Sequence, residues 1–239
     1  MEISGRTALV TGAARRLGRV MAVALADAGA DVVVHYRTSA DDARNTVAAI
    51  EATGQRAVAL QADVASARDV ARLISDTERA FGRLDILVNS AATFVRRPVL
   101  EISEEEWDHV LAVNLKGPFL LSQAAVPLLR TGGGVIVNLN DLSALQPWRS
   151  FAHHAVSKAG LLHLTRIFAR ALAPDIRVNS IAPGTVLPAP AYEGVDDSRK
   201  RVLHRAGEPA DVVGALLYLI ESDFVTGENL VVDGGRMLL

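Results

Sequence analysis

The stretch TALVTGAARRLGRV, residues 7–20, decides the predicted fold. It begins with a short apolar run, turns between Gly12 and Gly18, and continues into a helical pattern. Glycine permits a tight turn and a close approach of one backbone to another. The stretch therefore predicts a buried strand, a glycine turn and a helix in direct succession, which is the first unit of a parallel α/β sheet.

The same alternation continues to the end of the chain. Nearly continuous apolar runs suit parallel strands buried on both faces, and they predict strands at residues 7–12, 31–36, 57–63, 84–90, 134–140, 176–182 and 229–235. The segments between them predict crossover helices at about residues 16–29, 40–53, 66–81, 104–130, 152–173 and 209–221. We therefore expect one domain, residues 1–239, with a Rossmann-like, doubly wound parallel sheet of seven strands flanked by helices.

Composition narrows the class of protein. The 239 residues are 50% hydrophobic, carry a formal net charge of −2 and include no Cys. This charge gives no reason to expect nucleic acid or an anionic membrane as partner, and no apolar run approaches the roughly 20 residues that span a bilayer. Neither cysteine nor paired histidine spacing suggests a metal site. Because the start of the chain also lacks a signal-peptide layout, we predict a cytoplasmic protein.

The turn after the first strand predicts a phosphate-binding site. A helix N-terminus attracts a pyrophosphate, and the residues placed to hold one are Gly12, Arg15, Arg16, Leu17 and Gly18. Arg16 stands where the G-x-G-x-x-G pattern has a middle glycine, so an ordinary strand-to-helix turn is the alternative.

The end of the second strand bears on the choice of dinucleotide. A carboxylate there binds a ribose 2′-hydroxyl, whereas a cation accommodates a 2′-phosphate. The sequence VVVHYRTS presents Tyr36, Arg37 and Ser39, with no acidic residue before Asp41, and Arg15 or Arg16 would add a second positive charge. Because arginine can hold a phosphate through two hydrogen bonds, we predict NADP(H) rather than NAD(H). The alternative is that these arginines are only solvated.

Further motifs follow in a fixed order. NSAATF follows the predicted fourth strand, VNLKG lies at 113–117, HAVSKAG contains Lys158, and FVTGENLVVDGG lies at 224–235. With the phosphate loop, they make the chain resemble a short-chain dehydrogenase/reductase nearly end to end. The resemblance implies a catalytic Asn114, a substrate loop at about 185–205, and further cofactor-binding residues, namely Asp63, Val64, Asn89, Ala91, Lys158, Pro183, Gly184 and Val186.

Within that family the chain most resembles the pteridine reductases. TGAARRLG carries their arginine in place of a glycine, Asp141 stands where that branch has an aspartate, and Phe94 matches an aromatic that stacks on the pterin. The family's Y-x-x-x-K pair is altered, because His154 replaces the tyrosine. The resemblance implies that Asp141, His154 and Lys158 are catalytic, and that Phe94, Asp141 and His154 contact the substrate.

The histidine decides whether this site can work. His154 and Lys158 are four residues apart, so on a helix they project to the same face. An imidazolium can donate a proton near neutral pH. A nearby Lys158 ammonium disfavours the charged form of the His154 ring, whereas an Asp141 carboxylate favours it. Alternatively, Asp141 is held protonated in an apolar environment and donates the proton itself. His153 would point about 100° away on a helix, and we expect it on the surface.

Three functions are compatible with these residues. The first is NADPH-dependent reduction of a pterin, of the dihydropteridine or dihydromonapterin type, by hydride transfer to a C=N bond. The second is a carbonyl/alcohol dehydrogenase with His154 as its acid/base, and the third is a catalytically silent NADP-binding regulatory protein. The family resemblance also implies a small-molecule substrate and a homo-oligomer, with a tetramer favoured, packed through the helices at 104–130 and 152–173 and the C-terminal segment.

Overall fold

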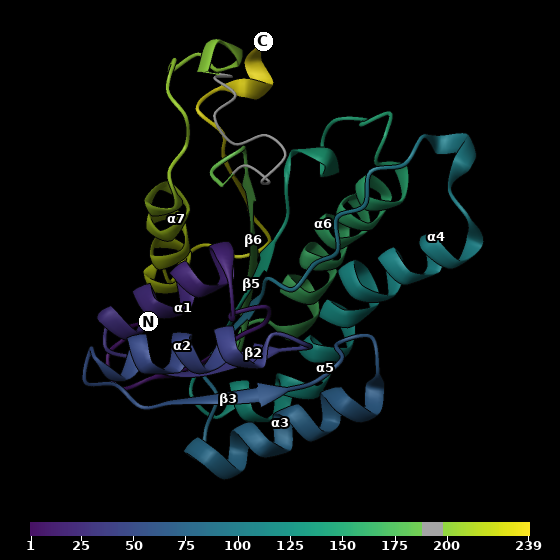
Figure 1. Ribbon diagram of the computed structural model, residues 1–239. Coiled ribbons are helices and arrows are strands. Elements are labelled where there is room, and N and C mark those ends of the chain that lie inside the picture. The colour runs from purple at the N-terminus through teal and green to yellow at the C-terminus, as the bar shows by residue number, and fades with distance from the viewer. Residues whose placement is uncertain (188–197) are drawn as a thin grey trace.

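The computed structural model describes residues 1–187 and 198–239, and their strands form one parallel sheet (Figure 1). The strand order is β3-β2-β1-β4-β5-β6-β7. The predicted doubly wound seven-stranded α/β fold is confirmed, with strand ends within a few residues of those expected. The strands are β1 (Thr7–Val10), β2 (Asp31–Tyr36), β3 (Ala57–Gln61), β4 (Ile86–Asn89), β5 (Val135–Leu139), β6 (Arg177–Pro183) and β7 (Asn229–Val232).

Helices cover both faces of this sheet (Figure 1). One face packs against α1 (Arg16–Asp27), α2 (Ala40–Glu51) and α7 (Pro209–Glu221). The other packs against α3 (Ala67–Phe81), α5 (Gly117–Arg130) and α6 (Ala152–Leu172), with α4 (Glu104–Leu111) lying against α6. Within the described residues, no helix is long and apolar enough to cross a bilayer.

The apolar strand runs are explained by burial on both faces. Successive residues of a strand point to opposite sides of the sheet. In β1, Ala8 and Val10 belong to the core under α1 and α7, whereas Leu9 belongs to the core under α3, α5 and α6. A polar residue at any of these positions would lie in one core or the other, so the strand has no polar alternation.

The strand order places a crevice beside β1. From β1 the chain winds outward to β3 at one edge, returns to β4 on the other side of β1, and then winds to β7. The connections after β1 and β4 therefore run in opposite directions and leave an opening at the carboxyl ends of these two strands. Ligands of open α/β sheets bind at such a point.

The predicted helix at 104–130 is wrong as a continuous helix. Helix α4 begins at a capping box, in which the Ser103 hydroxyl accepts from the Glu106 amide and the Glu106 carboxylate accepts from the Ser103 amide. It then passes into a π-helical turn, η2 (Ala112–Lys116), before α5 starts. π-helical turns are rare and frequently lie at functional sites. This one contains Asn114, whose side chain is buried.

Candidate active site

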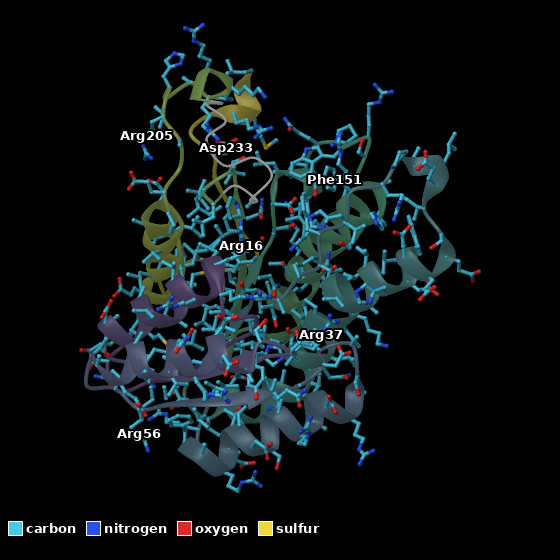
Figure 2. The ribbon with its side chains drawn as sticks, in the orientation of Figure 1. Arg16, Arg37, Arg56, Phe151, Arg205 and Asp233 are labelled. Atoms are coloured by element: carbon cyan, nitrogen blue, oxygen red, sulfur yellow. The ribbon has the colours of Figure 1, made fainter. Side chains whose placement is uncertain are left out.

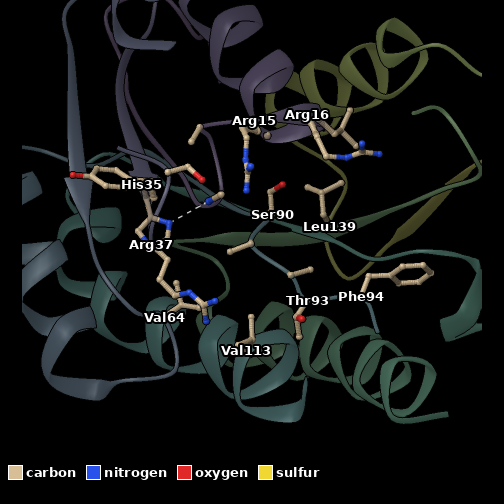
Figure 3. Close-up of a pocket in the computed structure, with 18 of the residues that line it drawn as sticks. Arg15, Arg16, His35, Arg37, Val64, Ser90, Thr93, Phe94, Val113 and Leu139 are labelled. Atoms are coloured by element: carbon tan, nitrogen blue, oxygen red, sulfur yellow. Dashed lines mark hydrogen bonds between the residues drawn. The ribbon is translucent and has the colours of Figure 1, made fainter. Parts of the chain in front are cut away.

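A cavity of about 520 Å³ opens at the carboxyl ends of the strands (Figure 3). Its wall combines segments that follow β1, β2, β3, β4, β5 and β6 with the first two turns of α6 and with Val113 of the π-helical turn. Most of the predicted site residues lie together in this wall, namely Gly12, Arg15, Arg16, Leu17, Gly18, Tyr36, Arg37, Ser39, Asp63, Val64, Ala91, Phe94, Asp141, His154, Lys158 and Pro183.

Four predicted residues lie outside the wall, namely Asn89, Asn114, Gly184 and Val186. Asn89 is buried, and its side-chain amide donates to Asn138 Oδ1 at 2.8 Å. The Gly184 amide donates to the Val232 carbonyl at 2.9 Å and so joins the end of β6 to β7. Asn89 and Gly184 therefore hold together strands whose ends carry the wall. Residues 188–197 of the predicted substrate loop lie outside the described residues.

The phosphate loop needs glycine for packing against its own neighbours. A Cβ at Gly18 would lie 2.3 Å from the Gly12 carbonyl oxygen, and one at Gly12 would lie 3.1 Å from Ala91 Cα. Arg16 occupies the middle position with φ 53°, a left-handed conformation that non-glycine residues rarely adopt. Its guanidinium donates to the Leu187 carbonyl at 2.6 Å, which links the phosphate loop to the segment after β6.

Arginines lie at different parts of this wall. Arg16 is on the side of the C-terminal segment, and Arg37 is on the side of β3 (Figure 2, Figure 3). Arg15 also lines the cavity, and its Nε lies 3.6 Å from Asp42 Oδ2, so its charge is partly balanced. Arg37 and Ser39 follow β2 without an acidic side chain between them.

The sequence interpretation missed His35, the penultimate residue of β2. Its imidazole is buried behind the phosphate loop (Figure 3), where Nδ1 accepts from the Gly12 amide at 3.1 Å. Its Nε2 lies 3.1 Å from the Ala62 carbonyl. Burial lowers the pKa of His35 to about 4, against the weaker opposing effects of the Ala62 carbonyl and the Asp63 charge. A histidine within the apolar run VVVHY was the signal that could have found it.

This low pKa predicts an acid-sensitive fold. Between pH 6.5 and about 4 the unfolded chain binds a proton at this histidine and the folded chain does not. Stability is therefore full above pH 6.5 and falls as the pH falls through that interval, by roughly 3 kcal/mol if His35 acts alone. Urea unfolding at pH 7 and pH 4.5 measures the loss, and a His35→Asn variant should lose less stability over the same interval. Equal losses in the two proteins would contradict the assignment.

Asp141 and His154 form a close pair on the cavity wall. His154 Nε2 lies 2.6 Å from Asp141 Oδ2, while Asp141 Oδ1 accepts from the Ser143 amide at 2.8 Å and hydroxyl at 2.5 Å. Burial by itself raises the pKa of Asp141, but the His154 hydrogen bond and the Lys158 charge outweigh it and lower the pKa to about 2. The alternative of a protonated Asp141 is therefore not supported, because these donors stabilise its carboxylate.

The Nδ1 nitrogen of His154 has a hydrogen-bond partner whether or not it carries a proton. Nδ1 lies 3.2 Å from the Thr93 carbonyl and 3.2 Å from the Asn114 side-chain nitrogen. A protonated Nδ1 can donate to the carbonyl, and an unprotonated one can accept from the amide. Asn114 is itself held by the Thr93 backbone, through Oδ1 at 2.8 Å and Nδ2 at 3.0 Å. The ring can thus gain or lose a proton without turning.

Lys158 lies one helical turn after His154 and is also buried. Its ammonium donates to the Leu139 carbonyl at 2.6 Å. Burial lowers the pKa of Lys158, and the Asp141 carboxylate opposes this effect. An ammonium has three N–H groups, and no second acceptor contacts this one in the part of the chain that the structure describes. The remaining donors are therefore placed for a ligand in the cavity.

Aromatic rings border the cavity beside His154. Phe94 is 55% exposed, and its ring stacks on Phe151 with centroids 4.4 Å apart. It meets the His154 ring edge-on at 4.7 Å and the Trp148 ring at 6.4 Å. This cluster leaves an apolar ring surface at the edge of the cavity, next to the His154 ring that pairs with Asp141.

The expectation that His153 lies on the surface is wrong. The side chain is fully buried, and neither ring nitrogen has a hydrogen-bond partner among the described residues. The physical reason is tertiary, because α4 packs against α6 and covers the face that a lone helix would expose.

Comparisons with known proteins bear on this site. A family model described as enoyl-(acyl carrier protein) reductase matches residues 12–236. The chain is 39% identical to 3β-hydroxysteroid dehydrogenase 1 of Eggerthella lenta, over 99% of the chain and 95% of that protein. It is 35% identical to a 3-oxoacyl-[acyl-carrier-protein] reductase of Staphylococcus epidermidis, over 98% of the chain and 99% of that protein.

Solved structures agree with these relatives. A short-chain type dehydrogenase/reductase from Mycobacterium marinum superposes with a TM-score of 0.91 at 32% identity, covering 100% of this chain and 97% of that one. The chain belongs to the short-chain dehydrogenase/reductase family. A carveol dehydrogenase from Mycobacterium avium in complex with NAD has a TM-score of 0.92 at 27% identity, covering 100% of this chain and 99% of that one.

Family membership makes the chain an oxidoreductase, so the catalytically silent alternative is set aside. Short-chain dehydrogenases/reductases use NAD(H) or NADP(H), and the cavity fits such a group. Its wall includes the glycine loop, Arg37 and the buried Lys158, whose ammonium donates to the Leu139 carbonyl. The relatives named above are not pteridine reductases, so the resemblance to that branch is not supported by them.

Proposed function

We propose that this short-chain dehydrogenase/reductase interconverts a carbonyl group and an alcohol with NADP(H), and that Asp141, His154 and Lys158 manage the proton. The observation that carries the proposal is the pair of His154 Nε2 and the Asp141 carboxylate, 2.6 Å apart on the cavity wall. Relatives named for hydroxysteroid and 3-oxoacyl substrates support a carbonyl or alcohol substrate.

The chain's own residues supply binding and proton transfer, while the nicotinamide, when bound, supplies or accepts the hydride. Lys158 would hold the dinucleotide through the N–H groups that Leu139 does not use. The transferable proton is the one on His154 Nε2, which Asp141 would share with a substrate oxygen at the cavity wall. The Asp141 side chain is 21% exposed, so it can meet both the ring and a substrate.

After the transfer, Nδ1 keeps its proton on the Thr93 carbonyl while Nε2 waits to be protonated again. Asn114 keeps that carbonyl in place, because its side chain accepts from the Thr93 amide and donates to the Thr93 carbonyl.

Oxidation of NADPH, followed by absorbance at pH 7, tests this function with cyclic ketones, a 3-oxoacyl thioester and a dihydropterin. We expect turnover of a ketone or the thioester, after cofactor binding has been established by nicotinamide fluorescence. Binding of NADPH with turnover of the dihydropterin alone would replace the carbonyl proposal with the second candidate below.

Reduction of a pterin is the second candidate. The exposed face of Phe94 beside His154 favours it, because an aromatic ring offers a stacking surface for a planar substrate. An ionised Asp141 has no proton of its own to give, so this candidate, like the carbonyl one, would draw its proton from His154.

Reversing the charge of Arg37 should change the cofactor preference. Arg37 lies in the cavity wall after β2, where a 2′-phosphate would be held, and a charge-assisted hydrogen bond contributes about 1.5–3 kcal/mol. We expect Arg37→Glu to raise the Kd for NADPH roughly 10–100-fold and to change the Kd for NADH by less than about threefold.

Arg79→Glu makes the same charge change on α3, outside the cavity wall, and serves as the control. Fluorescence titration of both variants with both dinucleotides measures the effect. A similar loss of NADPH and NADH affinity in Arg37→Glu would count against a 2′-phosphate site.

Further properties belong to the same proposal. All seven strands share one sheet, which supports a single domain over residues 1–239. Exposed apolar side chains on α5 and α6, namely Phe119, Val156 and Ile167, support the homo-oligomer, with a tetramer favoured. Light scattering after size exclusion distinguishes tetramer, dimer and monomer. The cytoplasmic location also stays a prediction.

A further inference from the structure

The buried His35 side chain holds the first part of the phosphate loop to the sheet. The Gly12 amide donates to His35 Nδ1 at 3.1 Å, and the next amide, of Ala13, donates to the His35 carbonyl at 3.0 Å. One residue of β2 therefore accepts from two successive amides of the loop. Because both amides are already used, the first part of the loop serves as an anchor, and the residues from Arg15 to Gly18 face the cavity.

The proton arrangement of His35 follows from its partners. A backbone amide can only donate, so Nδ1 must carry a lone pair, and Nε2 then carries the hydrogen that it donates to the Ala62 carbonyl at 3.1 Å. A single neutral tautomer satisfies both contacts. A protonated ring would place a second N–H against the Gly12 amide, and the loop would lose its anchor.

The loop is also anchored from its other side. The Thr11 hydroxyl accepts from the Ser90 amide at 2.9 Å and from the Ala91 amide at 3.0 Å, which joins the end of β1 to the segment after β4. His35 makes the corresponding connection to β2 and, through Ala62, to the end of β3. The imidazole thus joins the phosphate loop to the segment of Ala62, Asp63 and Val64 in the same cavity wall.

We infer that His35 is a positioning residue for dinucleotide binding, which acts by holding the Gly12 amide so that the phosphate loop has its binding shape before the ligand arrives. The inference rests on the proposed function, since it assumes that this cavity holds NADP(H). A loop that reaches its binding shape only part of the time binds with an affinity reduced by that fraction. His35 lines the cavity at the phosphate loop, and its ring is bonded to Gly12 and Ala62 rather than to Asp141, His154 or Lys158. We therefore expect it to affect the Kd for the cofactor and not the chemical step.

Substitutions can separate this role from simple core packing. Asparagine places an oxygen near the position of Nδ1, so the acceptor for the Gly12 amide is kept. Glutamine places a nitrogen near the position of Nε2, so the donor to Ala62 is kept and the acceptor is lost. Leucine loses both the acceptor and the donor. Val33 lies two residues earlier on the same face of β2 and is fully buried. Val33→Ala therefore lowers stability at a neighbouring position without removing any contact to the loop.

The first readout is the Kd for NADPH, measured by nicotinamide fluorescence at pH 7 on each folded variant. We expect His35→Leu and His35→Gln to raise it roughly tenfold or more, because a buried amide is left without an acceptor. His35→Asn should stay within about threefold of the wild type, and so should Val33→Ala, although its Tm falls.

The second readout is amide hydrogen exchange of the peptide that covers residues 10–18, measured without cofactor. Exchange should be faster in His35→Leu and His35→Gln than in Val33→Ala, and should be near that of the wild type in His35→Asn. Loop exchange therefore reports on the anchor independently of any enzyme activity.

The outcomes separate the two proposals. If the wild-type chain binds neither NADPH nor NADH, the proposed function fails. If the wild type binds and His35→Leu has the same Kd and the same loop exchange, only the role of His35 is overturned. A Kd that follows the loss of Tm across all four variants, Val33→Ala included, would also overturn it, because His35 would then be an ordinary core residue.

Discussion

Replacing His154 with phenylalanine is expected to lower kcat for carbonyl reduction by about 10²–10⁴-fold, the range that a general acid contributes. The variant keeps the ring that meets Phe94 and loses both nitrogens, so the hydrogen bonds to Asp141 and Thr93 disappear. The Kd for NADPH should change by less than about threefold, because Lys158 and the phosphate loop are untouched. Steady-state kinetics together with fluorescence titration separate the two quantities.

The neighbouring histidine supplies a matched control. His153 is equally buried on α6 and has no hydrogen bond through its ring in the described residues, so His153→Phe makes the same chemical change beside the site. We expect its kcat within a few-fold of the wild type. His154→Tyr should keep part of the carbonyl activity that His154→Phe loses, since a phenol can donate a proton. If His154→Phe retained full kcat, the histidine would not be the proton donor.

Replacing Lys158 with methionine is expected to lower kcat/KM by at least about 10³-fold, because the variant loses a contact to the dinucleotide and also the cation beside the Asp141–His154 pair that transfers the proton. The variant removes the donor to the Leu139 carbonyl and the cation that stabilises the Asp141 carboxylate. The Kd for NADPH should rise roughly tenfold, in contrast to the His154 variant.

The pH dependence gives this variant a separate signature. The Lys158 charge contributes to the low pKa of Asp141, so removing it raises that pKa. If catalysis needs the carboxylate, activity is lost as the pH falls through this pKa, and the acid limb of the kcat/KM profile should move to higher pH. Lys116→Met makes the same change at an exposed lysine of η2 and should leave the profile in place. An unmoved acid limb in Lys158→Met would contradict the coupling.

The architecture of this protein could be predicted from its residues alone. A parallel strand covered on both faces must be apolar at nearly every position, so runs such as TALV and DVVVHY identified the strands without knowledge of their neighbours. The segments between them were long enough for crossover helices, and right-handed crossovers leave few ways to arrange such a sheet. The order of motifs then placed most of the cavity residues, because the carboxyl ends of parallel strands meet at one edge.

Local patterns could not reveal how α4, α5 and α6 meet. The segment 104–130 has one helical pattern, yet the chain forms a π-helical turn at Ala112–Lys116. Packing of α4 on α6 buries His153, which a single-helix projection places on the surface. These outcomes depend on contacts between elements, whereas helical periodicity describes one element at a time.

The chemistry of the individual groups depends on how the chain folds. The pKa of Asp141 is low because His154, Lys158 and Ser143 gather around it, and the pKa of His35 is low because its ring is buried. His154 finds Thr93 at a separation of 61 residues and Asn114 at a separation of 40. A charge state depends on burial and on donors a few ångströms away, and those neighbours are far apart in the chain. The residue types were therefore readable from the sequence, but their protonation and partners were set by folding.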